Sequence, residues 1–360
     1  MSKLDELIAE LCPDGVEYVK LSSICDIKRG ERVTKSQLIE DGIYPVFSGG
    51  VSPMGYFNKF NREENTITIA QYGTAGYVNW IDEKFWANDV CYSLFPKEVI
   101  NKRYLYFVLV NLQDYIYTLR IDAVPAHLPV DRLGNIKIPL PPLAVQQEIV
   151  RILDNFTELT AELTAELTAR RKQYEYYRDL LLTFGDDVSW CNLDEILKIR
   201  NGKDYKSFNI GNIPVYGSGG IMTYIDTYAY DKPSVLIPRK GSIDKLYYVE
   251  KPFWTVDTIF YTEIYTSKVI PKYVFYCLQK ERLEQYNTAG GVPSLTQTVL
   301  NKVKIPVPPL EEQERIVAIL DRFDALCNDL TSGIPAEIEA RQKQYEYYRD
   351  KLLTFKEAKA

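Results

Sequence analysis

The sequence predicts an α+β protein with two globular domains joined by two long antiparallel coiled-coil helices. Three observations lead to this fold class. Segments far apart in the chain repeat almost residue for residue, each repeat carries a helical apolar stripe, and the blocks before the repeats mix short β-like runs with helical spacing. The chain is therefore interpreted as a tandem duplication with approximate twofold symmetry.

The repeat is clearest in a tyrosine-rich segment. KQYEYYRDLLLTF at 172–184 returns as KQYEYYRDKLLTF at 343–355, with one difference. Two further matching pairs precede it: IKIPLPPL at 136–143 with VKIPVPPL at 303–310, and QQEIVRILDNF at 146–156 with QERIVAILDRF at 313–323. Each half is thus expected to close with a strand, a proline corner and a long helix.

These matches divide the chain into four segments. Residues 1–135 and 185–302 are expected to form the two globular domains. Residues 136–184 and 303–360 are expected to form the proline corners and the two spacer helices.

Within the globular blocks, β-branched or aliphatic runs that end in glycine predict strands. TITIAQYG at 66–73 and SVLIPRKG at 234–241 occupy matching places. Residues 101–119 and 271–286 have helical length and spacing. The other matches are looser: 42–50 with 211–220, 123–128 with 291–295, Trp86 with Trp254, and Asp89 with Asp257.

One apolar stripe marks the first long helix, which we expect from about Glu148 to Thr183. Its members recur at threes and fours and include Ile149, Ile152, Leu153, Phe156, Leu159, Leu163, Leu167, Tyr174, Tyr177 and Leu181. The second copy has a matching stripe from Ile316 to Leu352. Because each helix leads away from its own domain, antiparallel pairing would place the domains at opposite ends. Gly333-Ile334-Pro335 should interrupt the second helix.

Composition identifies a globular protein, since 46% of residues are hydrophobic and 13% aromatic. The six cysteines form no CxxC pair, so we expect buried thiols in a reducing cytoplasm rather than zinc ligands or disulfides. Neither a membrane-length apolar run nor a signal-peptide core is found. We expect a cytoplasmic protein without a membrane partner.

The net charge of −6 is unevenly distributed. Residues 20–135 carry 13 basic and 13 acidic side chains, and residues 185–304 carry 15 and 13. The acidic excess lies in the N-terminal segment and the repeated segments. The two globular blocks are therefore compatible with DNA contact without demanding it.

The repeated motifs resemble the specificity subunit of type I restriction-modification systems. The proline corner, the QxxIVxIL helix start, the KQYEYYRDxLLTF ending and TELTAELTAELTA at 157–169 carry the resemblance, which covers essentially the whole chain. The array of TAEL units points to one branch of that family. The order would be target-recognition domain, spacer helix, second target-recognition domain and second spacer helix.

The resemblance implies a non-catalytic adaptor. Each target-recognition domain would read one half of a bipartite site on double-stranded DNA. The helices would set the half-site spacing and dock two methyltransferase subunits, and translocase-nuclease subunits would complete the complex. S-adenosylmethionine for adenine N6 methylation, and ATP with Mg²⁺, would belong to those partners, with no cofactor in this chain.

The absence of catalytic motifs in the sequence is consistent with a chain that recognises DNA while its partners carry out the reactions. The sequence contains no GxxxxGK[ST] loop, no Asn-Pro-Pro-aromatic motif and no paired metal-ligand spacing. Glu17 and Lys20 in PDGVEYVK have one residue too many between them for the usual nuclease Glu-x-Lys, so an ordinary turn into a strand is the favoured interpretation.

The candidate DNA contacts lie in loops that match between the two blocks but differ in side chains. Arg and Lys suit guanine and phosphate, whereas Asn and Gln suit adenine. The candidates in the first block are Arg29, Arg32, Gln71, Tyr72 and His127, and those in the second are Arg200, Lys203, Arg239 and Lys240. The alternative interpretation is that these candidates lie in solvated turns without a DNA contact. Trp86 and Trp254 are expected to hold the domain core rather than to contact DNA.

The candidate docking residues for methyltransferase subunits lie in the tyrosine-rich repeat. Tyr174 and Tyr177 fall on the helix-pair stripe, whereas Tyr176 and its copy Tyr347 fall off it. Tyr and Arg on an exposed helix face are typical of protein interfaces. We therefore select Tyr176, Arg178, Tyr347 and Arg349.

Two other functions remain open on the residues alone. A coiled-coil scaffold that binds no DNA fits the near-neutral globular blocks, because phosphate binding usually leaves a basic surface. The specificity domain of a fused restriction enzyme is a second alternative, but this chain contains no catalytic motif. The recognised bases are not predictable, since recognition domains of this family vary greatly.

Overall fold

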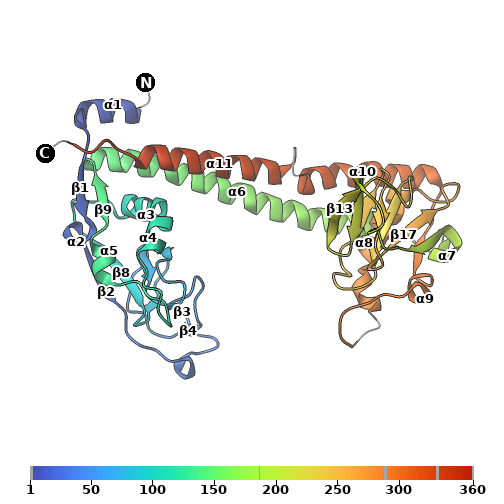
Figure 1. Cartoon of the computed structure of the whole chain (residues 1–360), viewed down its shortest axis with the longest axis horizontal. Coiled ribbons are helices and arrows are strands. Elements are labelled where there is room, and N and C mark those ends of the chain that lie inside the picture. Colours follow the sequence, from blue (N-terminus) through green and yellow to red (C-terminus); the bar gives the residue numbers. More distant parts are fainter. Residues whose placement is uncertain (1–2, 186, 288–289, 330–331, 359–360) are drawn as a thin grey trace. The chain divides into compact units, whose positions relative to one another are not determined.

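The computed structural model describes residues 3–185, 187–287, 290–329 and 332–358, which form two compact units. Unit 1 comprises Met1–Glu162 together with Ile338–Ala360, and unit 2 comprises Leu163–Glu337. Each unit therefore combines segments that are distant in the sequence. The prediction of two tandem α+β domains with a long helix is confirmed (Figure 1).

Unit 1 consists of short helices and strands followed by the first part of a long helix. Its elements are α1 (Lys3–Leu11), β1 (Glu17–Lys20), α2 (Leu21–Ile24), β2 (Cys25–Arg29), η1 (Lys35–Gln37), β3 (Tyr44–Phe47), β4 (Tyr56–Phe57), β5 (Thr66–Ala70), β6 (Val78–Ile81), β7 (Trp86–Ala87), β8 (Cys91–Pro96), α3 (Lys102–Asn111), α4 (Gln113–Thr118), α5 (Val130–Gly134), β9 (Lys137–Leu140) and α6 (Leu143–Leu181). Residues of α6 up to Glu162 belong to this unit.

Unit 2 repeats this order from the later part of α6 onward. Its elements are β10 (Trp190–Asn192), α7 (Leu193–Ile196), β11 (Leu197–Asn201), β12 (Ile210–Gly217), β13 (Gly220–Ile225), β14 (Ser234–Pro238), β15 (Tyr247–Val249), β16 (Trp254–Thr255), β17 (Ile259–Ile264), α8 (Pro271–Glu281), η2 (Leu283–Tyr286), α9 (Gln297–Leu300), β18 (Lys304–Pro306) and α10 (Leu310–Asn328). The last helix, α11 (Ile334–Leu353), has most of its length in unit 1.

The two units have the same sheet topology. A four-stranded antiparallel sheet has the order β2-β8-β5-β6 in unit 1 and β11-β17-β14-β15 in unit 2. A three-stranded sheet has the order β4-β3-β7 in one and β13-β12-β16 in the other, and each unit adds one two-stranded pair, β1-β9 or β10-β18. The duplication seen in the sequence is thus a duplication of the fold.

Helix α3, which follows β8 in unit 1, and helix α8, which follows β17 in unit 2, each form a core with the four-stranded sheet of the same unit. Tyr104 on α3 and Tyr273 on α8 are fully buried. Their hydroxyls donate to Pro139 O (3.2 Å) and Pro306 O (3.1 Å), which lie in matching strands. Burying an aromatic ring while satisfying its hydroxyl favours one orientation of the helix over the sheet.

A buried glutamine holds the proline corner of each unit. In unit 1, Gln146 Nε2 donates to Pro141 O (2.7 Å) and Val99 O (3.3 Å), and its Oε1 accepts from Asn101 N (2.7 Å). In unit 2, Gln313 makes the same three bonds, to Pro308 O, Lys268 O and Ile270 N. The amide thus ties the start of the long helix to the segment that leads into α3 or α8.

The first long helix begins at Leu143, five residues before the predicted start. Pro141 and Pro142 have no N–H to lose at a helix N-terminus, so the helix can start directly after them. No glycine or proline interrupts α6, and it is rich in Ala, Leu and Glu, which favour helices (Figure 1).

The predicted interruption of the second long helix is confirmed. Helix α10 ends at Asn328 and α11 begins at Ile334. Gly333 lies so close to the α10 backbone that a Cβ there would approach Ala325 O within 2.6 Å and Asp329 O within 2.8 Å. A residue without a Cβ is therefore needed where the chain turns from one helix into the next.

Within each unit the long-helix segments run antiparallel, as the stripe predicts. In unit 1, Phe156 on α6 stacks on Tyr348 of α11, with ring centroids 5.5 Å apart. In unit 2, Tyr177 on α6 stacks on Phe323 of α10 at 5.7 Å. Ile149, Leu153, Ile316 and Leu320 are fully buried in the cores of their units, whereas Leu326 is exposed.

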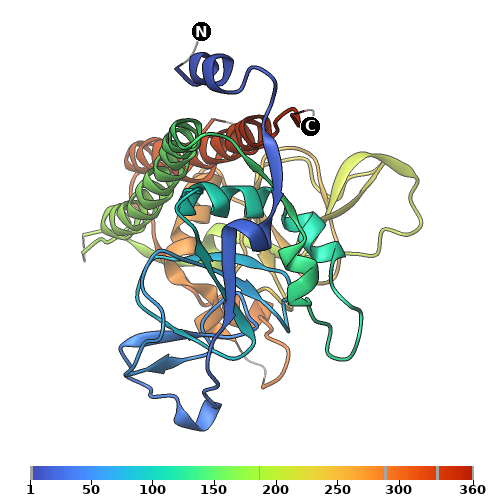
Figure 2. The ribbon, with the colours of Figure 1, turned by 90° about the vertical axis from the view of Figure 1, so that its left-hand side faces the viewer.

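Unit 1 is closed by contacts between the two ends of the described chain (Figure 2). Val16 N donates to Lys356 O (2.9 Å), and Ala358 N donates to Val16 O (2.9 Å). Tyr18 Oη donates to Phe355 O (3.0 Å), and Lys137 pairs with Glu357 (3.4 Å). Residues 355–358 therefore extend the edge of the unit beside the segment that enters β1.

All six cysteines are free, as predicted, and five are buried, while Cys191 is half-buried. Burial raises the pKa of Cys25, Cys91 and Cys277 to about 12. Such thiols stay protonated at neutral pH, which makes them unreactive core residues. None of the helices in the described part of the chain is long and apolar enough to cross a bilayer.

Candidate nucleic-acid interface

The first candidate loop is the tight turn Ala70–Gly73 after β5, which we call the unit 1 turn. Its backbone is fixed on both sides, because Gln71 N donates to Val90 O (2.9 Å) and Leu128 N donates to Gln71 O (2.9 Å). Tyr72 also forms a β-bridge with His127. The structure thus brings His127 beside Gln71 and Tyr72, although His127 lies 55 positions after Tyr72 in the sequence.

The side chains of this turn form a stacked cluster. Tyr72 and His127 lie ring on ring, with centroids 5.5 Å apart and planes 25° apart. Both rings are half-buried, whereas Gln71 is buried. Partly exposed planar side chains of this kind can stack on bases or contact base edges.

Arg29 joins the same cluster through Tyr92. Arg29 and Tyr92 are paired residues of β2 and β8, and the guanidinium lies 5.8 Å from the ring centroid. Burial raises the pKa of Tyr92, although hydrogen bonds from Arg29 and Gln71 oppose this. Tyr92 Oη donates to Leu128 O (3.1 Å). Tyr92 was not a candidate in the sequence, since a strand tyrosine gives no functional signal, yet it orients two candidates.

Arg32 lies apart from this cluster. It is exposed in the loop after β2, and it has no ion-pair partner among the residues that the structure describes. The adjacent Val33 is held by Asn88, which exchanges two hydrogen bonds with its backbone. Arg32 therefore extends from a fixed backbone into solvent.

The second candidate loop, Pro238–Gly241, is called the unit 2 turn and has the same backbone bonds. Arg239 N donates to Thr258 O (2.8 Å), and Leu295 N donates to Arg239 O (2.9 Å). Lys240 forms a β-bridge with Ser294, as Tyr72 does with His127. Ser294 is thus the counterpart of His127, a candidate that the match of residues 123–128 with 291–295 could have identified.

The side chains of the unit 2 turn are cationic. Arg239 is half-buried, with its guanidinium 5.8 Å from the ring centroid of Phe260, and Lys240 is exposed. Phe260 pairs with Asn201 in the strand register, just as Tyr92 pairs with Arg29. The structural counterpart of Arg29 is therefore Asn201, which lies one position after the candidate Arg200.

Arg200 and Lys203 are not brought into this cluster. Arg200 forms an ion pair with Glu263 (2.9 Å), and that hydrogen-bonded partner raises the pKa of the guanidinium. Lys203 is exposed, and its backbone oxygen accepts a hydrogen bond from Trp254 Nε1 (2.9 Å). The equivalent indole of Trp86 donates to Glu31 O (2.8 Å), so both tryptophans anchor a loop, as expected of scaffold.

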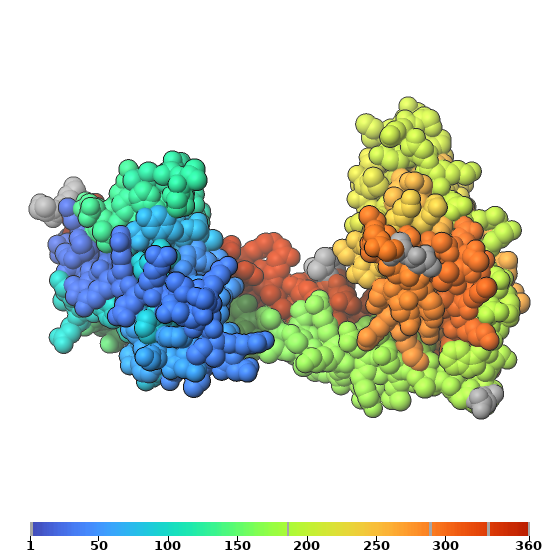
Figure 3. Space-filling model, turned by 90° about the horizontal axis from the view of Figure 1, so that it is seen from below, coloured from blue at the N-terminus to red at the C-terminus, as the bar shows by residue number. Residues whose placement is uncertain are grey.

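An exposed hairpin distinguishes unit 2. Strands β12 and β13 form a longer ladder than their counterparts β3 and β4. Figure 3 shows this hairpin standing out from the rest of its unit. Its exposed apolar side chains are Ile210, Ile221, Met222 and Tyr224. A patch of this kind is typical of a surface that contacts another molecule.

The two candidate docking tyrosines have matching environments. Tyr176 is 65% exposed and Tyr347 is 62% exposed. Each packs edge-to-face on the next residue, Tyr177 or Tyr348, with centroids 5.4 Å apart. Tyr177 stacks on Phe323, and Tyr348 stacks on Phe156. Each exposed ring therefore packs on a tyrosine that is itself fixed by the facing helix segment.

The neighbouring arginines are less accessible. Arg178 is only 8% exposed, donates to Asp179 Oδ1 (2.8 and 2.9 Å) and lies against the ring of Tyr174. Arg349 donates to Asn111 Oδ1 (3.0 Å) and to Asp350. Both guanidiniums therefore bond to their own unit, so the two tyrosines are the most exposed of the four candidate docking residues.

Comparison with known families gives one match, which occurs twice. Residues 13–170 and 186–340 each match the family described as type I restriction modification DNA specificity domain. The two matches together cover most of the chain and correspond to the two copies of the fold.

Similar proteins match over nearly their full length. The chain is 34% identical over 374 residues to a putative type I restriction enzyme specificity subunit of Haemophilus influenzae, covering 94% of this chain and 96% of the relative. It is 33% identical over 407 residues to the EcoR124I/EcoR124II specificity subunit of Escherichia coli, covering 99% and 97%.

A crystal structure of the type I restriction-modification S subunit from M. genitalium has a similar fold. The TM-score is 0.66 at 21% identity, and the alignment covers 94% of this chain and 96% of that one. At this identity the similarity concerns the fold.

Proposed function

The chain belongs to the type I restriction-modification DNA specificity family, and from this premise we propose that it is the subunit that chooses the DNA sequence. Each unit reads one half of a bipartite site on double-stranded DNA. The target-recognition domains are residues 1–135 and 185–302, and the spacer segments are residues 136–184 and 303–360. The protein itself is not catalytic.

One observation carries the proposal. The second residues of the unit 1 turn and the unit 2 turn make matching backbone hydrogen bonds, yet Gln71, Tyr72 and His127 in one stand where Arg239, Lys240 and Ser294 stand in the other. A fixed frame with different donors and acceptors is what two readers of different half-sites need, because sequence is read by side chains at base edges.

The remaining candidates are assigned by their environment. Arg29 lies against the ring of Tyr92 and so belongs to the unit 1 cluster. Arg32, Lys203 and Lys240 are exposed cations suited to phosphates. Arg200 already has a carboxylate partner, so it contributes by holding β11 against β17 or by exchanging that partner for phosphate.

The partners supply the chemistry. We propose that two methyltransferase subunits dock on the exposed faces of Tyr176 and Tyr347, with Arg178 and Arg349 fixing those helix segments against their own units. S-adenosylmethionine, and ATP with Mg²⁺ in the translocase-nuclease subunits, belong to these partners. The assembly acts in the cytoplasm.

The spacer helices set the distance between half-sites. Phe156 and Lys172 are 16 positions apart, whereas Phe323 and Lys343 are 20 positions apart and enclose the break at Gly333. One Thr-Ala-Glu-Leu unit adds about 6 Å and roughly 40° to a helix. Changing the number of these units should therefore alter the spacing by one or two base pairs without altering the bases read.

The central experiment maps methylated sites genome-wide in cells that carry the methyltransferase with wild-type protein or with one unit deleted from 157–169. We expect the same two half-sites with a shorter spacer. An unchanged spacer would refute the role of the helices as a ruler. If the wild-type protein directs no sequence-specific methylation, the DNA proposal fails and a scaffold without DNA is favoured.

Docking is tested separately by capture of the methyltransferase on immobilised protein. The double variant Tyr176→Ala with Tyr347→Ala should lose capture, because large exposed aromatic residues dominate interface energies. Tyr228→Ala, another exposed tyrosine, is the matched control and should capture normally. Undiminished capture by the double variant would count against docking at these two rings.

A further inference from the structure

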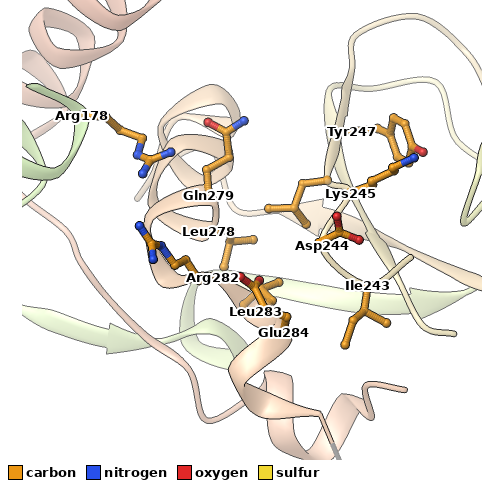
Figure 4. A pocket seen from close by; sticks show the side chains of 11 residues that line it. Arg178, Ile243, Asp244, Lys245, Tyr247, Leu278, Gln279, Arg282, Leu283 and Glu284 are labelled. Carbon is orange, nitrogen blue, oxygen red and sulfur yellow. The ribbon is translucent and has the colours of Figure 1, made fainter. Parts of the chain in front are cut away.

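A pocket of about 380 Å³ lies at the C-terminal end of α8 in unit 2 (Figure 4). Its walls come from α6 through Arg178, from the segment 243–247 that follows the unit 2 turn, and from Leu278 to Glu284. None of the functions proposed above uses this pocket.

Arg178 forms part of one wall and has hydrogen-bonding capacity to spare. It is nine-tenths buried, and Asp179 accepts from its Nε (2.9 Å) and Nη2 (2.8 Å). For Nη1 there is no acceptor in the part of the chain that the structure describes. Nη1 is not among the buried atoms of the described residues that lack a partner, so it is open to solvent and can donate to a bound anion.

Arg282 and Gln279 add further donors beside it. Figure 4 shows the guanidinium groups of Arg178 and Arg282 facing each other. The Arg282 side chain has no hydrogen-bond partner among the described residues, and its backbone has the left-handed φ of 47°. The Gln279 oxygen already accepts from Tyr174 Oη (3.1 Å), so its NH₂ group is available to donate.

Of the two facing guanidiniums, that of Arg178 is paired with Asp179, whereas that of Arg282 has no ion-pair partner among the described residues. Facing guanidiniums repel unless an anion lies between them, and a dianion would compensate both. Asp244 and Glu284 also line the pocket, but Lys245 is a third cation. Figure 4 shows Asp244 on the opposite wall from Arg178, near Lys245. Neither Asp244 nor Glu284 forms an ion pair with Arg178 or Arg282 among the described residues, so these donors can also bind an external anion.

The matching place in unit 1 is closed. Gln113 stands nine residues after Tyr104, as Arg282 stands nine residues after Tyr273. Gln113 Nε2 donates to Gly76 O (2.8 Å), and Val78 N donates to its Oε1 (2.9 Å). The glutamine thus bridges the helix end to the segment after the unit 1 turn. In unit 2 an arginine without such bonds leaves this space open.

We propose that this pocket is a phosphate-binding site, with Arg178, Arg282 and Gln279 as its donors. The planar fork of arginine matches the tetrahedral oxygens of a phosphate group, and two arginines match its double charge. The phosphate can be a free phosphate ion or a backbone phosphate of bound DNA, because segment 243–247 directly follows the unit 2 turn.

The first measurement is isothermal titration of inorganic phosphate into the full-length protein at low ionic strength. We expect saturable binding of one phosphate per chain, weakened at least tenfold by Arg282→Gln. Arg322→Gln removes the same charge from an exposed position on α10 and should bind as wild type does. Arg178→Gln should weaken binding as well, provided that its thermal unfolding matches wild type.

The second measurement distinguishes the two sources of phosphate. If DNA supplies it, Arg282→Gln lowers duplex affinity and reduces the slope of log affinity against log salt by about 1, while Arg322→Gln does not. If the ion is free, Arg282→Gln leaves duplex affinity unchanged.

The phosphate site is refuted if wild type shows no saturable binding, or if Arg282→Gln binds phosphate as wild type does. Failure of wild type to bind any duplex would instead refute the DNA function, while the phosphate titration would still decide this proposal.

Discussion

The unit 1 turn and the unit 2 turn differ in three of their four side chains but share the two backbone hydrogen bonds of their second residue and the β-bridge of their third. The backbone N–H of the second residue donates to the residue directly before a strand of the four-stranded sheet, from Gln71 to Val90 or from Arg239 to Thr258. The backbone oxygen of the same residue accepts from Leu128 in unit 1 and from Leu295 in unit 2. In both, the third residue forms a β-bridge, Tyr72 with His127 and Lys240 with Ser294. The frame and the side chains placed on it are therefore separable in this molecule.

This difference shows where the two copies have been held fixed and where they have changed. The fixed parts are buried hydrogen bonds whose loss would leave polar backbone groups unsatisfied, as at Gln146 and Gln313. Apart from the buried Gln71, the side chains that differ are half-buried or exposed, and substitution at such positions costs little stability. Four pairs of variants would break or sharpen this comparison.

The largest effect is expected at the proline corners. Gln146→Leu and Gln313→Leu each remove three hydrogen bonds to buried backbone groups, so we expect each to lower the free energy of unfolding by about 3 kcal/mol. Denaturant unfolding of each variant measures this. A large loss for one and none for the other would show that the two corners are not equivalent.

The next effect concerns the side chains on the turns. Arg239→Ala should weaken binding to the cognate duplex by roughly 10- to 100-fold, since a base or phosphate contact of arginine is worth about 1–3 kcal/mol. Methylation mapping should show relaxed choice in one half-site only. Tyr72→Ala is the reciprocal variant and should relax the other half-site. Relaxation of both halves by either variant would contradict the assignment of one turn to one half-site.

A smaller difference is expected between two strand arginines. Arg29 lies against Tyr92 beside the unit 1 turn, whereas Arg200 is paired with Glu263. We expect Arg29→Gln to weaken duplex binding about tenfold and Arg200→Gln about twofold, measured at one fixed salt concentration. Equal losses would mean that Arg200 leaves Glu263 when DNA binds.

The smallest effect is expected at Glu148, which ties α6 to α1 in unit 1. Glu148 accepts from Lys3 on α1 (2.9 Å) and from Arg151 (2.6 Å), which lowers its pKa from 4.5 to about 2. A lowered folded-state pKa stabilises the fold above pH 4.5, and this contribution is lost as the pH falls toward 2. We expect Glu148→Gln to cost about 1 kcal/mol at pH 7, after allowing for solvent screening.

Unfolding of wild type and Glu148→Gln between pH 2 and pH 7 tests the last prediction, and the gap between the two should close on acidification. Glu339→Gln removes an exposed pair with Lys343 and serves as the control, with a smaller expected cost. A gap that is independent of pH would show that packing, and not charge, explains the loss.

Much of the fold could be predicted because it follows from local patterns that occur twice. The glycine-terminated strands, the proline corners and the break at Gly333-Ile334-Pro335 all depend on residues whose backbone preferences are strong. The start of α6 was predicted five residues late, since the buried role of Gln146 cannot be seen in an apolar stripe. Leu326, which falls at a stripe position between Ile316 and Leu352 in the second copy, is exposed.

The candidate site was less predictable because it depends on contacts between distant segments. The stacking of Tyr72 on His127 joins residues 55 positions apart, and the ion pair of Arg200 with Glu263 joins residues 63 positions apart. Charge in a loop suggests a contact but does not reveal whether the charge is already paired. Arg178 was selected as an interface residue, yet its burial follows from its position over Tyr174.

The bonding of Val16 to residues 356–358 has a consequence for chain connectivity. In unit 2, helix α6 and strand β10 follow each other along the chain, whereas unit 1 connects the segment after α11 to the segment before β1 by hydrogen bonds between residues that are far apart in the sequence. The junction is therefore non-covalent in unit 1 where it is covalent in unit 2. A circular permutant with a linker from Ala358 to Lys3 and new termini near Gly185 should keep the fold of each unit.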